Sequence, residues 1–134
     1  HVPHAHTDGD SFIYFKKANV IHAGDIFFNG FYHFIDVTHG GSLKGMIMAA
    51  DKILSLADDK TKIIPGHGPM GDKAQLAGYR QMLRTAYERL RKLKTEGKTA
   101  QEAVAAKPLA DLEEAWGDGI FNGDRWIEII YPGV

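Results

Sequence analysis

The chain alternates short runs of β-forming residues with longer segments of helical period, and this alternation restricts its fold more than any other feature. SFIYF (11–15) and NVIHA (19–23) are rich in β-branched and aromatic residues and are separated by three residues, so they predict two antiparallel strands. TKIIP (61–65) predicts a third strand. Between them, Ser42 precedes a segment (43–57) whose apolar residues recur at helical spacing. Strands and helices in this order predict an α/β arrangement.

Outside these elements the chain is expected to be irregular and then mainly helical. Residues 23–41 have no clear period and several glycines, so they predict a long loop. Asp72 and Thr99 each stand three residues before a Gln or Glu, the spacing of a capping box, and they predict the starts of a long and a short helix. One or two further helical turns are expected at 109–116. The segment GDRWIEIIYPGV suits a helix capped by Asp124 or a strand, and we favour the helix.

The predicted order is therefore β-β-α-β-α-α, followed by this last helix, in a single domain of residues 1–134. A chain of this length can bury roughly two-thirds of its unfolded surface. Its formal net charge of −1 gives no global attraction to nucleic acid or anionic membranes, and no apolar run is long enough to span a bilayer. Basic residues gather in the long helix without a nearby set of stacking aromatics, so a solvated face is favoured over a nucleic-acid contact.

The chain begins with HVPHAH, without Met or a secretory leader, and this stretch resembles the inside of a domain. We therefore expect a processed chain, a truncated chain or a natural fragment. Cysteine is absent, which excludes disulfides and thiolate metal ligands. Because many periplasmic proteins also lack disulfides, the expected compartment of this soluble chain is left open between cytoplasm and periplasm.

Three residues able to bind metal stand in similar local settings. His6 precedes Thr-Asp-Gly-Asp, whereas Asp25 and His67 each follow a predicted strand and one glycine. In α/β sheets functional side chains gather where strands end, so these three can converge although they are distant in sequence. Two imidazoles and one carboxylate with a water form a tetrahedral Zn²⁺ site that keeps an open catalytic position. On spacing alone, unconnected loop residues are an equally good interpretation.

The segments AHTDGDSFIYF, NVIHAGDIFF and KIIPGHGP, in this order, resemble the second half of a metallo-β-lactamase superfamily domain. The similarity continues through GGSLKGMIMAADKIL and the long helix, so it covers most of the chain. It implies that His6 binds a first metal and His67 a second, and that Asp25 bridges the two metals as the catalytic carboxylate. It also implies that Thr7, Asp8 and Asp10 are turn residues or neighbours that orient His6.

One large departure from the superfamily pattern limits this resemblance. The main signature of the superfamily, His-X-His-X-Asp-His, lies upstream of the matching segment and supplies two ligands to each metal. HAHTDGD matches that signature only in part, with Asp10 in place of its last His, and we assign this stretch to the later motif. Only three of the usual metal ligands are then present, and a complete two-metal site cannot form within the chain.

The resemblance also implies an incomplete fold. The superfamily fold is a four-layer αββα sandwich of two similar halves, and this chain resembles one half. Standing alone, the strands at 11–15 and 19–23 would leave a contiguous apolar surface, which usually marks an association site. We therefore expect a homodimer or pairing with a separate N-terminal half, and no membrane partner.

Two functions from different classes are open. The first is a metal-dependent hydrolase in which Zn²⁺, or another divalent metal, activates a hydroxide to attack a small-molecule ester, thioester, lactam or phosphoester. The second is a non-catalytic α/β oligomerisation module with a residual metal site. The chain is an enzyme only if another segment or chain supplies the missing ligands. RNA processing through the basic helix is a weaker third alternative.

The remaining histidines are interpreted more simply. His22 lies within a predicted strand and is expected to be packed or hydrogen-bonded. His1 and His4 are expected to be exposed. For His33 and His39, in the predicted loop, contact with a substrate is the less favoured alternative.

Overall fold

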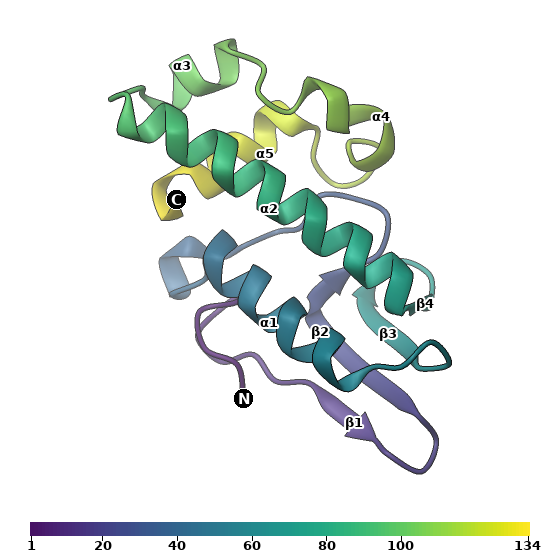
Figure 1. The fold of residues 1–134 in the computed structure, drawn as a ribbon. Helices are drawn as coiled ribbons and strands as arrows, with labels where there is room; N and C mark the ends of the chain where they lie inside the picture. The colour runs from purple at the N-terminus through teal and green to yellow at the C-terminus, as the bar shows by residue number, and fades with distance from the viewer.

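The computed structural model describes all 134 residues and contains one four-stranded mixed sheet (Figure 1). The strands lie in the order β1 (Ile13–Phe15), β2 (Val20–Phe28), β3 (Lys62–His67) and β4 (Gly71–Asp72). β2 pairs antiparallel with β1 and parallel with β3, and β3 pairs antiparallel with β4. Because parallel neighbours cannot be joined by a hairpin, helix α1 (Leu43–Leu56) makes the crossover from β2 to β3. The predicted α/β class is confirmed.

Four more helices follow the sheet. They are α2 (Lys73–Thr95), α3 (Ala100–Ala105), α4 (Glu113–Trp116) and α5 (Gly123–Ile130). Short 3-10 helices occupy Val37–His39, Ala110–Leu112 and Tyr131–Gly133. α1 and α2 lie side by side over the sheet, and α3 and α5 pack together near the C-terminal part of α2 (Figure 1). Both predicted capping boxes, at Asp72 and Thr99, are present. None of the helices has the length and hydropathy needed to cross a membrane.

The hydrophobic core lies between one face of the sheet and the helices α1 and α2. On the strands, Ile21 and Ile63 are fully buried and lie opposite each other in the β2–β3 register. The helices meet them with apolar residues at helical spacing, so that the burial of these side chains stabilises sheet and helices together. The fully buried residues of α1 and α2 are Met46, Ala50, Ile53, Leu76, Tyr79, Leu83, Ala86 and Leu90.

The opposite face of the sheet is not covered by a helix. Ile13 and Phe15 project from β1 on this face and are 58% and 50% exposed. Across the strands, Ile13 lies opposite His22, which in turn lies opposite Ile64. His22 is exposed rather than packed, although its Nδ1 accepts a hydrogen bond of 3.2 Å from the Gly24 N–H. One face of the sheet is therefore core, and the other carries apolar side chains in contact with solvent.

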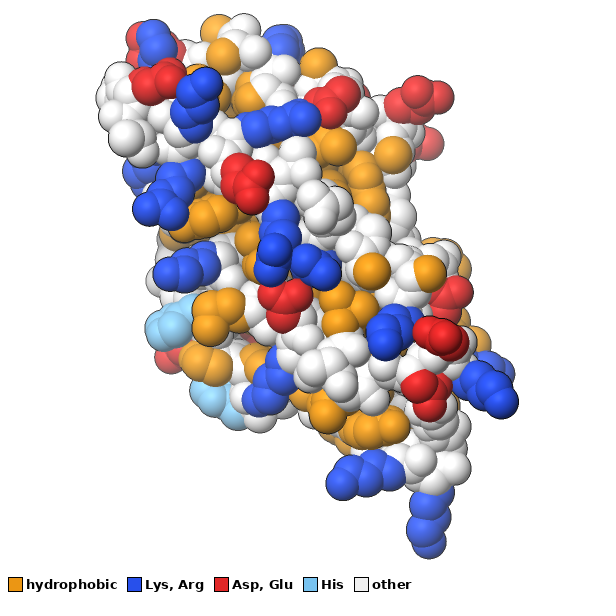
Figure 2. Space-filling model, viewed as in Figure 1, with side chains coloured by type: hydrophobic (Ala, Val, Ile, Leu, Met, Phe, Trp, Pro, Cys, Tyr) orange, Lys and Arg blue, Asp and Glu red, His pale blue; other side chains and the backbone are white.

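The outer face of α1 and α2 carries charges of both signs. Arg80 and Arg84 of α2 form ion pairs of 3.3 and 3.1 Å with Asp51 of α1. Figure 2 shows acidic side chains interspersed among the lysines and arginines over this part of the surface. Mixed charges of this kind suit a solvated face better than a polyanion-binding surface.

Several predicted boundaries are wrong. β1 begins at Ile13 rather than Ser11, and β3 continues to His67 rather than ending at Pro65. β2 continues to Phe28, so the first six residues of the predicted loop at 23–41 belong to a strand. A single glycine in a β-forming run permits a bulge rather than ending the strand. The last helix is capped by Asn122 rather than Asp124, because the Asn122 side chain accepts a hydrogen bond of 2.9 Å from the Arg125 N–H. The short strand β4 was not predicted, since two residues give no periodic signal.

Candidate metal centre

Asp25 lies in β2 where the strand leaves regular pairing with β3. The register shifts between His22 and Gly24 and again between Gly24 and Phe28. Gly24 has a φ of 54°, a left-handed conformation that glycine adopts without strain. On the neighbouring strand, a Cβ added to Gly66 would lie 2.1 Å from Asp25 Oδ1 and 2.9 Å from the Gly24 carbonyl oxygen. The two glycines therefore create the bulge and the space that the Asp25 carboxylate occupies.

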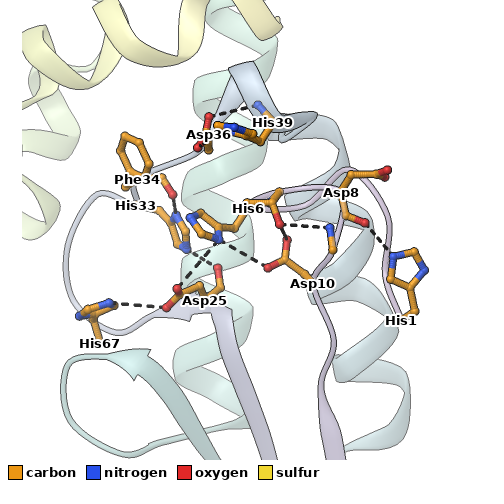
Figure 3. A network of polar contacts seen from close by, with 12 residues as sticks. His1, His6, Asp8, Asp10, Asp25, His33, Phe34, Asp36, His39 and His67 are labelled. Carbon is orange, nitrogen blue, oxygen red and sulfur yellow. Dashed lines mark hydrogen bonds and ion pairs between the residues drawn. The ribbon is translucent and has the colours of Figure 1, made fainter.

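His67 is the last residue of β3, and buried Asn29 holds the turn that follows it. The Asn29 N–H donates to the His67 carbonyl at 3.0 Å, and its side-chain amide donates to the Pro69 carbonyl at 3.0 Å. Gly68 has a φ of 92°, which keeps the turn tight against Asn29. Asn29 was not among the predicted site residues, although an Asn-Gly pair after an apolar run is a turn signal. The turn leaves the His67 imidazole directed at Asp25 (Figure 3).

His6 comes from the N-terminal segment, which packs against the loop that precedes α1. The His6 carbonyl accepts a hydrogen bond of 2.9 Å from the Asp36 N–H. A Cβ added to Gly41 would lie 2.1 Å from the same carbonyl oxygen, so the two backbones touch. The segment is therefore held by its main chain, and the His6 ring is left free to face Asp25 and Asp10.

The three predicted metal ligands lie together, with Asp25 between the two histidines (Figure 3). Asp25 Oδ2 is 3.9 Å from His6 Nδ1, and Asp25 Oδ1 is 3.5 Å from His67 Nε2. Two ligand atoms of one tetrahedral zinc ion lie about 3.4 Å apart. Each imidazole thus faces a different oxygen of the carboxylate at a separation near that of a shared ion. These contacts are made in pairs, however. Nowhere in the chain does a group of three or more His, Cys, Asp or Glu side chains lie so that it could hold a metal ion.

Two of the predicted supporting residues lie beside His6. Asp10 Oδ1 is 3.5 Å from His6 Nδ1, the nitrogen that also faces Asp25. The other oxygen of Asp10 accepts a hydrogen bond of 2.6 Å from the Thr7 N–H. Thr7 therefore holds the carboxylate of Asp10, and Asp10 contacts the ring of His6.

The other two lie outside this group. Asp8 pairs with His4 at 3.4 Å, and both side chains are exposed. His39 is 75% exposed and its Nδ1 is 2.7 Å from Asp36 Oδ2. Hydrogen bonds from the Thr38 hydroxyl and then from His39 lower the pKa of Asp36 to about 2. The contacts of Asp8 and His39 are therefore with residues other than the three predicted metal ligands.

His33 was not assigned to the site by sequence analysis, yet it lies directly behind Asp25. Its side chain is completely buried, with Nε2 2.5 Å from the Asp25 carbonyl oxygen and Nδ1 on the Phe34 carbonyl. The ring of Phe28 covers it at a centroid distance of 3.7 Å. Burial lowers the pKa of His33 to about 3, so the ring is neutral at pH 7 and its single N–H can be donated to only one of these two carbonyls. His33 lies in the predicted loop, but its position in the sequence gives no sign of its contact with Asp25.

Comparison with known proteins adds little to this geometry. No protein-family model and no curated protein matches the chain. Solved structures with a similar backbone include TTHA1623 in a di-iron-bound form, at 27% sequence identity and a TM-score of 0.49. The match covers 57% of this chain and 37% of that one, so the chain corresponds to little more than a third of its length. A likeness at this level assigns neither a fold family nor a metal.

Proposed function

We propose that this chain is the C-terminal half of a metallo-β-lactamase-like domain and supplies His6, Asp25 and His67 to the metal centre of a hydrolase. The observation that carries the proposal is the position of Asp25, whose two carboxylate oxygens face two different imidazoles. A carboxylate in this position is suited to bridge two ions, with one histidine on each side.

The residues present fit divalent metal ions in donor chemistry. Imidazole nitrogens with a carboxylate oxygen are ligands that Zn²⁺ accepts, and iron uses the same types. Gly66 supports this interpretation, since its missing side chain is what leaves room for Asp25 Oδ1. In this arrangement the chain would offer each ion one imidazole and one carboxylate oxygen. Two or more ligands for each ion must then come from elsewhere, in agreement with the missing upstream signature.

The proposed chemistry is the hydrolysis of a small-molecule ester, thioester, lactam or phosphoester. The bound metal would supply Lewis-acid activation of water and stabilisation of the developing oxyanion. Asp25, the proposed catalytic residue, would accept a hydrogen bond from the attacking water and hold it between the two imidazoles. Asp10 Oδ1 lies 3.5 Å from the same His6 nitrogen that faces Asp25, so this carboxylate would stand beside the bound ion.

The missing ligands and the open sheet face have a common explanation in our proposal. The exposed Ile13 and Phe15 would be covered by a second copy of the chain, in a homodimer, or by a separate N-terminal half that completes the αββα sandwich. Light scattering after size exclusion tests the homodimer at micromolar concentration. We expect the wild type to be dimeric and Phe15→Lys to be monomeric. A monomeric wild type leaves the separate half as the partner.

The alternative is a non-catalytic α/β oligomerisation module with a residual metal site. It is favoured by one observation, namely that no group of three ligands could hold an ion within the chain. Zinc retained without any turnover, in the assembled state, would establish this alternative.

Metal analysis together with generic esterase and phosphodiesterase assays separates the two functions. We expect wild-type protein to bind zinc and His6→Asn, Asp25→Asn and His67→Ala to lose it. His4→Asn is the matched control, since His4 is exposed in the same segment and Asn tolerates its φ of 58°. Turnover that His67→Ala abolishes and His4→Asn preserves supports the hydrolase. Wild-type protein that takes up no zinc in its assembled state contradicts both functions.

A further inference from the structure

Two buried side chains connect the C-terminal helix α5 with the main chain of Asp25. Trp126 of α5 donates from Nε1 to the His33 carbonyl at 2.5 Å. The imidazole of His33 in turn lies 2.5 Å from the Asp25 carbonyl through Nε2. Trp126 and His33 are both completely buried, and Tyr32 stacks on Trp126 at 4.5 Å between ring centroids. A continuous contact therefore runs from residue 126 to residue 25.

The contact reaches Asp25 at the point where the sheet supports it least. Gly24 pairs with Pro65 and Phe28 with His67, whereas Asp25 has no partner in the β2–β3 register. At such an irregularity a side-chain donor can supplement the hydrogen bonds of the ladder. With its proton on Nε2, the His33 imidazole donates to the Asp25 carbonyl, and the unprotonated Nδ1 then faces the Phe34 carbonyl.

We propose that Trp126 and His33 are positioning residues that fix the main chain of Asp25, so that helix α5 controls the metal affinity of the site. This inference rests on the proposed function only for its metal readout. Metal sites tolerate ligand displacements of only about 0.2 Å, so a small rotation of the Asp25 peptide is enough to weaken binding. Loss of a supporting hydrogen bond around a metal site typically lowers affinity about tenfold or more.

Trp126→Phe tests the first contact, because it keeps an aromatic ring and removes the N–H. Tyr131→Phe is the matched control: it also removes one hydrogen bond to a main-chain carbonyl from the C-terminal region, the 2.8 Å bond from the Tyr131 hydroxyl to Lys98. Amide hydrogen exchange of the metal-free proteins is the first readout. We expect exchange of residues 24–34 to be about fivefold faster in Trp126→Phe and unchanged there in Tyr131→Phe.

Replacing His33 tests the second contact. Gln reaches about as far as the imidazole Nε2 and can donate to the Asp25 carbonyl, whereas Leu fills the space without a donor. Zinc titration by calorimetry should show affinity lowered about tenfold in His33→Leu and restored to within about threefold of wild type in His33→Gln. A role limited to core packing predicts the reverse order, since Leu is the better apolar filler.

The two readouts keep this inference separate from the proposed function. If wild-type protein in its assembled state binds no zinc, the proposed function fails, while hydrogen exchange of the metal-free chain still decides whether the contact positions Asp25. Unchanged exchange at residues 24–34 in Trp126→Phe, or equal zinc affinity in His33→Leu and His33→Gln, overturns the inference. Near-ultraviolet circular dichroism of each variant checks that the comparison is made between folded proteins.

Discussion

Gly66→Ala is expected to damage the metal centre more than its size suggests. The new Cβ would lie 2.1 Å from Asp25 Oδ1 and 2.9 Å from both the carbonyl carbon and oxygen of Gly24. The carboxylate could rotate away, but the Gly24 backbone is held within the sheet, so strands β2 and β3 must separate slightly. Overpacking of this kind costs about 1–3 kcal/mol of folding free energy. The carboxylate displaced by rotation would also leave its position between His6 and His67.

The assays are thermal unfolding of the metal-free protein and zinc titration by calorimetry. We expect Gly66→Ala to lower Tm by about 4–10 °C and to weaken zinc binding by about tenfold or more. Gly78→Ala is the matched control, since no atom lies within 4 Å of a Cβ added there, inside α2. An exposed helical Gly→Ala change stabilises by about 0.5–1 kcal/mol, so its Tm should rise. Wild-type zinc affinity in a folded Gly66→Ala protein would refute the reasoning.

Two further predictions follow from polar contacts away from Asp25. The Thr38 hydroxyl and His39 hold the Asp36 pKa at about 2. The stability that this carboxylate contributes is therefore present above its usual pKa near 3.8 and is lost as pH falls toward 2. Carboxyl NMR titration should show a midpoint near 2 that Thr38→Val raises, and a wild-type midpoint near 3.8 would contradict this. Lys94 Nζ donates to the Tyr131 and Pro132 carbonyls at 3.1 Å each. Urea denaturation should therefore show the unfolding free energy of Lys94→Met lowered by about 1–2 kcal/mol. Lys92→Met is the control, and its unfolding free energy should stay near that of the wild type.

The helical half of the chain was readable from the sequence because its signals are local. Asp72 and Thr99 each place an acceptor three residues before a Gln or Glu, and the two capping boxes form as expected. The apolar positions of α2 recur with a helical period over its whole length, and they are the positions that are buried. Capping hydrogen bonds and helical spacing involve residues only a few positions apart, so the sequence alone is enough to predict them.

The course of β2 through residue 25 could not be read in this way. Gly24 looks like the end of a strand in sequence, whereas in the structure it forms a bulge after which β2 continues to Phe28. The bulge is stabilised by close approach to Gly66, which lies 42 residues away. A contact between two distant glycines has no periodic signature, so only the tertiary structure shows it.

The candidate site was predicted in its main residues but not in its support. His6, Asp25 and His67 were proposed from their settings and from a family resemblance, and the structure brings them together. Asn29 and His33, which hold the main chain around them, were missed because their partners are backbone carbonyls. Side chains that bind backbone leave no ligand pattern in a sequence.

Anomalous scattering from crystals grown with zinc tests the central claim most directly. We expect density on both sides of the Asp25 carboxylate, one peak shared with His6 and one with His67, with metal–ligand distances of about 2.0–2.2 Å. The contradicting result is an absence of any ion beside Asp25 in crystals of the assembled protein, whether zinc is bound elsewhere or not at all.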